Sequence, residues 1–239
     1  MKIQQMYIPK SPNKRPMLTK RQKGIVIHST ANTAPAINEA KNLARPGNKK
    51  YASFNTVIDD KEIIEVIPHN EITYNAANRE GNWHYIAIEM TEGGNRDKVI
   101  QNTVKYTAML LKKYGWNTSH LRRHYDFPRS DTGWKKPCPQ ILMYNNWQGW
   151  IEFKTLVEIE LQGGLSNMTE KEVREIVYDI IEPSRNGGSP NAHWAYKHFT
   201  NLNELGANLQ ERRFDDMMTR GEVFAFVDKL LTSINLTDK

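Results

Sequence analysis

The feature that most constrains the fold is a short run of apolar, β-branched residues, Gly24-Ile25-Val26-Ile27-His28-Ser29. Successive Ile and Val side chains leave no polar face, and a run of this kind is typical of a strand buried in the centre of a sheet. The polar end of the run, His28-Ser29, then lies where an α/β fold places side chains into a cleft. The first part of the chain is therefore interpreted as an α/β domain.

Further strand and helix patterns follow this run in the order expected of such a domain. We expect strands at residues 53–58, 62–67 and 85–90, the first two joined by a hairpin at Asp59-Asp60-Lys61. We expect helices at residues 36–44, at 98–114 before Gly115, and within 142–161. The predicted architecture is a mixed central sheet flanked by helices.

The sequence changes character at Gln162-Gly163-Gly164, where the balance of charge turns from basic to acidic. We therefore predict one domain over residues 1–162 and a second over 163–239. The second segment contains two similar stretches, beginning at Met168 and Met218, each with a Thr-x-x-Glu capping box and apolar positions at helical spacing. They predict a small all-α C-terminal domain, although two ordinary amphipathic helices can also look alike by chance.

Composition limits the classes of protein to which the chain can belong. A net charge of +6 fits a solvated basic surface or a polyanionic partner such as an anionic cell wall. We expect no nucleic-acid partner, because no motif typical of nucleic-acid recognition accompanies the charge. No window reaches the ~20 apolar residues that span a bilayer, and the N-terminus lacks the pattern of a secretory signal. The single cysteine excludes an intrachain disulfide.

Three residues that lie far apart in the sequence have the chemistry of a metal site. His28 ends the apolar run, His124 lies in Arg123-His124-Tyr125-Asp126, and Cys138 stands between two prolines. Catalytic zinc sites use three protein ligands and leave the fourth position for water. Taken singly, each His also fits a structural role, and Cys138 fits a small buried hydrophobe. The spacing matches no compact zinc-finger pattern, so the tertiary fold must assemble such a site.

Three strings of residues together resemble one family. They are Gly24-Ile25-Val26-Ile27-His28-Ser29-Thr30-Ala31-Asn32, Arg123-His124-Tyr125-Asp126 and Lys136-Pro137-Cys138-Pro139. Their order and spacing are similar to those of type-2 N-acetylmuramoyl-L-alanine amidases, which include phage endolysins and relatives of peptidoglycan recognition proteins. The resemblance implies a Zn²⁺ ion held by His28, His124 and Cys138. It also implies hydrolysis of the amide bond between N-acetylmuramic acid and L-alanine of the stem peptide.

The same resemblance implies two catalytic residues. Ile86-Ala87-Ile88-Glu89-Met90 resembles the family strand that carries a glutamate, and Glu89 would then accept a proton from water. A carboxylate that is buried without partners is costly, so its position needs a reason; the alternative is a glutamate on the solvent face of an edge strand. Lys136 matches the Lys-x-Cys-Pro pattern and would stabilise the oxyanion. Lys135 is the alternative source of that charge.

Some positions depart from the family pattern. Many relatives carry an aromatic–His pair where this chain has Phe54-Asn55, and often a His near Asn75. Because neither asparagine titrates, Glu89 would carry more of the acid–base chemistry. The substrate groove is predicted to include Asn32, Phe54, Trp83, Arg129 and Trp134.

The C-terminal segment has a resemblance of its own. Ala192-His193-Trp194-Ala195 and residues 218–224 resemble a half-module of the surface-layer-homology type, which implies binding of a secondary cell-wall polymer. A dimerisation unit or a solubilising appendage remains the alternative. The whole chain is thus predicted to be an endolysin that stays in the host cytoplasm until release and acts on bacterial peptidoglycan. A host autolysin and a receptor without catalysis are the competing classes, and Cys138 speaks against the receptor. No feature predicts the oligomeric state.

Overall fold

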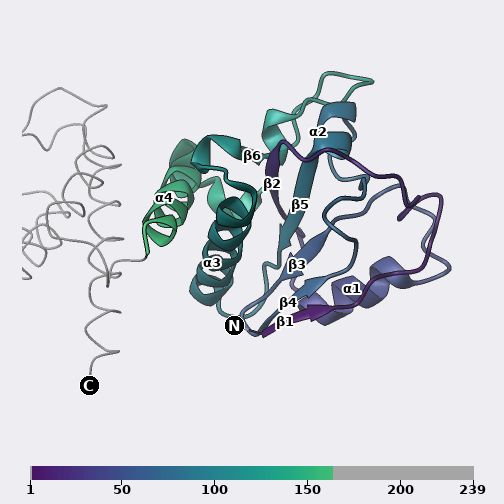
Figure 1. Cartoon of the computed structure of the whole chain (residues 1–239), viewed down its shortest axis with the longest axis horizontal. Coiled ribbons are helices and arrows are strands. Elements are labelled where there is room, and N and C mark those ends of the chain that lie inside the picture. Colours follow the sequence, from purple (N-terminus) through teal and green to yellow (C-terminus); the bar gives the residue numbers. More distant parts are fainter. Residues whose placement is uncertain (1, 164–239) are drawn as a thin grey trace, which may run out of the picture. The chain divides into compact units, whose positions relative to one another are not determined.

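The computed structural model describes residues 2–163 of the chain (Figure 1). Within this range, the strands are β1 (Lys2–Gln5), β2 (Gly24–Ser29), β3 (Thr56–Ile58), β4 (Glu62–Glu65), β5 (Tyr85–Met90) and β6 (Leu121–Arg123). The α-helices are α1 (Ala36–Ala44), α2 (Arg79–His84), α3 (Arg96–Tyr114) and α4 (Tyr144–Leu161). No helix in this range combines the length and the apolar character that crossing a bilayer requires.

The strands form one mixed sheet in the order β1-β4-β3-β5-β2-β6. Strand β2 pairs in parallel with β5 on one side and with β6 on the other. Strand β3 pairs in parallel with β5 and forms an antiparallel hairpin with β4. All six residues of β2 are buried, which confirms the central strand predicted from its β-branched run.

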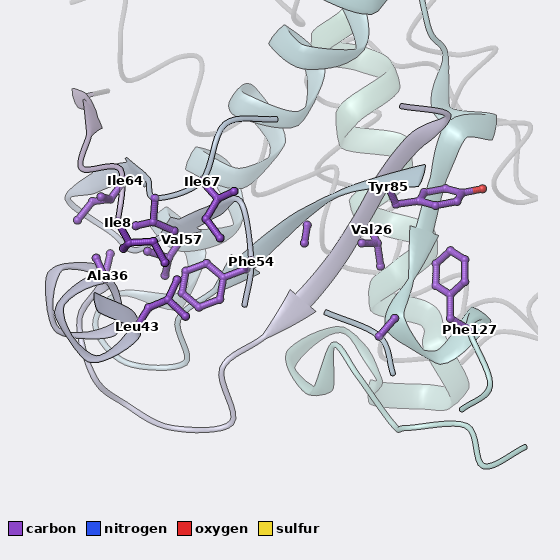
Figure 2. Close-up of a cluster of buried hydrophobic side chains, with 14 residues drawn as sticks. Ile8, Val26, Ala36, Leu43, Phe54, Val57, Ile64, Ile67, Tyr85 and Phe127 are labelled. Atoms are coloured by element: carbon purple, nitrogen blue, oxygen red, sulfur yellow. The ribbon is translucent and has the colours of Figure 1, made fainter. Parts of the chain in front are cut away.

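Helices α1 and α3 lie on opposite faces of the sheet (Figure 1). Side chains alternate between the faces along each strand, and one alternating set packs against Ala36, Ala40 and Leu43 of α1. Figure 2 shows this core, which includes Val26, Phe54, Val57, Ile64 and Ile67. The other set faces α3 and contains Ile25, Ile27, Ile86 and Ile88. Helix α3 begins at the capping side chain of Asn95 and ends at Gly115, whose φ of 66° suits glycine.

The predicted mixed sheet with flanking helices is confirmed, and the differences concern the ends of elements. The strand expected at residues 53–58 is regular only from Thr56, and its partner ends at Glu65. The reason is a local departure from the ladder, in which the backbone N–H groups of Val66 and Ile67 both donate to the carbonyl of Asn55. Strands β1 and β6 and helix α2 were not predicted. The predicted all-α domain of residues 163–239 lies almost entirely outside the described residues.

Buried Asn55 joins three segments around this irregular point. Its Oδ1 accepts from the backbone N–H of Ala87 at 2.9 Å and from Lys20 Nζ at 3.2 Å. Its Nδ2 donates to the carbonyl of Pro68 at 2.9 Å. The asparagine that departs from the family pattern at this position therefore serves the fold, because its amide is fully engaged in holding strands together.

Candidate metal centre

Three parallel strands, β5, β2 and β6, end side by side and define the site. His28 is opposite Glu89 in the ladder between β2 and β5. Arg123, the last residue of β6, is opposite Ile27, so His124 follows at the same edge of the sheet. Since the carboxyl ends of parallel strands meet at one edge, this order brings Glu89, His28 and His124 together from positions far apart in the chain.

Cys138 reaches the same edge on a loop that returns after β6. The backbone N–H of Ser29 donates to Cys138 Sγ at 3.4 Å, and the backbone N–H of Tyr125 donates to the Cys138 carbonyl at 3.1 Å. Ser29 Oγ in turn accepts from the backbone N–H of Gln140 at 2.8 Å. Sequence reasoning did not assign Ser29 a role, although its place directly after His28 was the available signal.

His28, His124 and Cys138 offer ligand atoms that all lie within 4.8 Å of one another, and all three residues are buried. The two imidazole rings are 4.6 Å apart between centroids. No hydrogen bond in the described part of the chain satisfies His124 Nδ1. Two nitrogen donors and one sulfur donor make up a three-ligand set of the kind that catalytic Zn²⁺ sites use.

Burial sets the protonation of these donors. It lowers the pKa of His124 to about 4, with a further contribution from the charge of Lys136. It also lowers the pKa of His28 well below its ordinary value, assisted by His124 and Lys136. The pKa of the Cys138 thiol is raised to about 12, first by burial and then by Glu89. The imidazoles are thus neutral and ready to donate lone pairs, whereas a cation bound to sulfur would displace the thiol proton.

Glu89 lies beside the three donors on the same face of the sheet. Its Oε1 is 4.0 Å from His28 Nδ1, and its buried Oε2 has no hydrogen-bond partner among the described residues. Burial raises the pKa of this carboxyl to about 7, although the charge of Lys136 acts in the opposite direction. A carboxyl with this pKa can take up and release a proton near neutral pH.

The two neighbouring lysines, Lys135 and Lys136, have different surroundings in the structure. The charge of Lys136 acts on the pKa of His28, Glu89, His124 and Cys138. Lys135 instead places its Nζ over the ring of Tyr125, 5.4 Å from the centroid. Lys136 is therefore the cation whose field reaches the site.

The residues predicted to line the substrate groove differ in their surroundings. Trp83 and Trp134 are exposed, and Arg129 forms an exposed ion pair with Asp131 at 2.7 Å. Asn32 is exposed beyond the end of β2, where its Oδ1 accepts from the backbone N–H of Ala34. Phe54, by contrast, is only 9% exposed and packs in the core beside Leu43 (Figure 2). The role of these five residues in binding substrate stays a prediction.

The segment at Asn75 and Ala76, which sequence reasoning did not assign to the site, influences both histidines. The side chain of Asn75 raises the pKa of His28, and the backbone carbonyl of Ala76 raises the pKa of His124, both against the larger effect of burial. Asn82 Oδ1 anchors the segment by accepting from the backbone N–H groups of Asn75 and Ala76, both at 2.9 Å. The departure from the family pattern at Asn75 was the signal that could have identified it.

Comparison with known proteins agrees with this arrangement of residues. Residues 18–140, which include all three metal-ligand candidates and Glu89, match the model of the N-acetylmuramoyl-L-alanine amidase family. The chain belongs to this family. The match ends at Gln140, so it leaves the C-terminal segment uncovered.

Individual proteins similar to this chain carry the name of the same family. The N-acetylmuramoyl-L-alanine amidase CwlA of Bacillus subtilis is 34% identical over 158 residues, which are 62% of this chain and 54% of the relative. The amidase XlyB of the same organism is 32% identical over 59% of this chain and 44% of its own length. The chain thus spans about half the length of the curated relatives it matches.

Solved structures match over nearly their whole length. The catalytic domain of XlyA has a TM-score of 0.58 and 29% identity, covering 66% of this chain and 99% of that structure. PlyL has a TM-score of 0.57 and 28% identity, covering 66% of this chain and 98% of that structure. The described part of the chain therefore has the fold of endolysin catalytic domains.

Proposed function

We propose that the chain is a zinc-dependent amidase that hydrolyses the bond between N-acetylmuramic acid and L-alanine in bacterial peptidoglycan. The observation that carries the proposal is the convergence of His28, His124 and Cys138 within 4.8 Å, beside the carboxyl of Glu89. Family membership supports the bond that is cleaved, because the matched relatives are amidases of this name.

The chain's own residues supply the acid–base and electrostatic parts of the reaction. Glu89 accepts a proton from the attacking water at Oε2 and returns it to the leaving amine; this role is supported by the lack of any other partner for that buried oxygen among the described residues. Lys136 stabilises the negative charge that develops on the carbonyl oxygen. A Zn²⁺ ion held by the two histidines and the cysteine supplies Lewis acidity towards the carbonyl and the water.

The biological setting that we propose is phage-type lysis from within, with the enzyme acting on the wall after release from the host cytoplasm. A solved endolysin from Bacillus subtilis supports it, with 29% identity and a TM-score of 0.58 over 99% of that structure. Residues 163–239 would add binding to a secondary cell-wall polymer. That part of the proposal rests on the sequence alone.

The reaction can be tested with purified peptidoglycan and the zinc-loaded protein. We expect new free amino groups on L-alanine and no new sugar reducing ends. Reducing ends would identify a glycosidase instead. Binding to peptidoglycan with neither product would identify a receptor without catalysis. The Cys138→Ser variant should lose zinc, and unchanged zinc stoichiometry would remove Cys138 from the site.

A further inference from the structure

The metal centre is surrounded by buried polar atoms that lack partners. Among residues 2–163, such side-chain atoms include His28 Nε2, Asn75 Oδ1, Glu89 Oε2 and His124 Nδ1. An unpartnered buried polar atom costs free energy, so each needs an explanation. Metal binding accounts for His124 Nδ1 and proton transfer for Glu89 Oε2. His28 Nε2 and Asn75 Oδ1 are left, one a potential donor and the other an acceptor.

The orientation of the Asn75 amide follows from its neighbours. Nδ2 donates to Thr73 Oγ1 at 2.9 Å and lies 3.3 Å from the carbonyl oxygen of Gly81 and 3.4 Å from that of Thr73. Turning the amide over would place Oδ1 against two carbonyl oxygens, which cannot donate. Oδ1 must therefore point away from them, and the Asn75 side chain raises the pKa of His28, the direction expected of an acceptor facing the imidazole.

The orientation of the His28 ring is also determined by its neighbours. Nδ1 lies 3.9 Å from Cys138 Sγ and 4.0 Å from Glu89 Oε1. The Nδ1 edge of the ring thus faces the other site residues, and Nε2 lies on the opposite edge. A neutral imidazole carries one proton, and a metal-bound nitrogen must be the unprotonated one.

We propose that Asn75 is a positioning residue, whose Oδ1 accepts the Nε2–H of His28 and so holds the ring with its Nδ1 lone pair towards the metal. The inference rests on the zinc site proposed above. The backbone carbonyl of the next residue, Ala76, raises the pKa of His124. Metal-ligating histidines generally donate their other ring N–H to an acceptor of this kind.

Zinc affinity, measured by competition with a chelator, tests the proposal without relying on activity. Asn75→Leu removes the acceptor and should weaken Zn²⁺ binding about 10- to 100-fold. Asn75→Asp keeps an oxygen towards His28 and should retain more zinc affinity than Asn75→Leu, but its second oxygen faces the carbonyls of Thr73 and Gly81, so its stability should fall. Thr73→Val is the matched control: it removes a partner of Nδ2 but leaves Oδ1, so it should lower stability without a comparable loss of zinc affinity.

Nitrogen-15 NMR of the zinc-loaded, unmodified chain provides a second readout that needs no variant. We expect a protonated Nε2 on His28, and a protonated Nδ1 would overturn the proposal. Folded Asn75→Leu protein with unchanged zinc affinity, or Thr73→Val protein with an equal loss, would also overturn it. If the unmodified chain takes up no zinc at all, the proposed metal site fails and the role of Asn75 fails with it.

Discussion

At the scale of single residues, burial and the charge of Lys136 act on the pKa of Glu89 in opposite directions. Burial of the Glu89 carboxyl raises its pKa to about 7, and the charge of Lys136 limits that rise. A carboxyl on a fully solvated strand would instead be ionised throughout the neutral range. The position of Glu89 at the end of β5, beside His28, therefore explains why a glutamate occurs in an otherwise apolar strand.

Replacing Glu89 by glutamine should remove the proton acceptor while keeping the shape of the side chain. We expect the rate of L-alanine release from peptidoglycan to fall by about 10²- to 10⁴-fold, the range typical of general acid–base groups. Zinc stoichiometry should not change. Glu80→Gln, at a side chain that is 48% exposed on α2, is the matched control and should keep its activity. Full activity in the Glu89→Gln protein would exclude this role.

The two neighbouring lysines should differ in their effect on turnover. Lys136→Ala should lower the turnover number by about 10- to 10³-fold, because a preorganised charge is lost where negative charge develops. Lys135→Ala removes only the cation that lies over Tyr125 and should change the turnover number little. Steady-state kinetics on the two variants gives the comparison. The reverse order of effects would assign the charge to Lys135.

At the scale of elements, a buried polar cluster ties α3 to the sheet on the face opposite the metal centre. The hydroxyl of Tyr106 on α3 donates to Glu65 Oε1 at 2.7 Å and lies 3.2 Å from Thr56 Oγ1. It is also 3.1 Å from Nε2 of His69, a histidine whose pKa burial lowers to about 4. The cluster thus connects one helix to two strands through a single hydroxyl, with a neutral imidazole at its edge.

Tyr106→Phe should therefore destabilise the domain without affecting the reaction. The change removes the donor to Glu65 Oε1, while Oε2 still accepts from Gln5 and Tyr7, so we expect a loss of about 1 kcal/mol in the free energy of unfolding. Tyr51→Phe, at a side chain that is 70% exposed, should change it by less than about 0.5 kcal/mol. Urea unfolding measures both variants. Equal stability of the two would show that the cluster contributes little.

At the scale of the whole molecule, a buried lysine makes stability depend on pH. Lys20 Nζ donates to the carbonyl of Tyr85 at 2.6 Å and to Asn55 Oδ1 at 3.2 Å, both neutral groups. Burial without a carboxylate lowers the pKa of Lys20 to about 7. In the unfolded chain this amine keeps its ordinary pKa of 10.5. The unfolded state therefore binds more protons between these two values, and stability should rise with pH across that window.

Lys20→Met tests this effect, since it keeps the length of the side chain and removes the amine. The cost of burying the cation is present in full below pH 7 and fades towards pH 10. Between pH 7 and pH 9.5, the unmodified protein should therefore gain about 3 kcal/mol relative to the variant. Urea unfolding of both chelator-treated proteins at the two pH values gives this difference. A difference that stays constant with pH would show that Lys20 does not titrate in this range.

Strands and helices of the domain could be predicted where the pattern of neighbouring residues in the sequence is enough to specify them. The β-branched run of β2 and the periodic pattern of α3 follow from near neighbours in the chain. β2 therefore appeared at the expected residues, and α3 began two residues before the predicted start and ended where predicted. The start of β3 at Thr56 was not predictable, because it depends on the carbonyl of Asn55 accepting from the backbone N–H groups of both Val66 and Ile67. Strand β6 is three residues long and was too short to leave a pattern.

By itself the sequence determined the buried strand β2, the helices α1, α3 and α4 and, through one family resemblance, the three candidate metal ligands. Only the tertiary structure decided how they meet, because the order β5-β2-β6 places strand ends from distant parts of the chain side by side. It also brought the charge of Lys136 within reach of the Glu89 carboxyl and placed Phe54 in the core. Local patterns act over a few residues, whereas the direction of a side chain in a site depends on every segment packed around it.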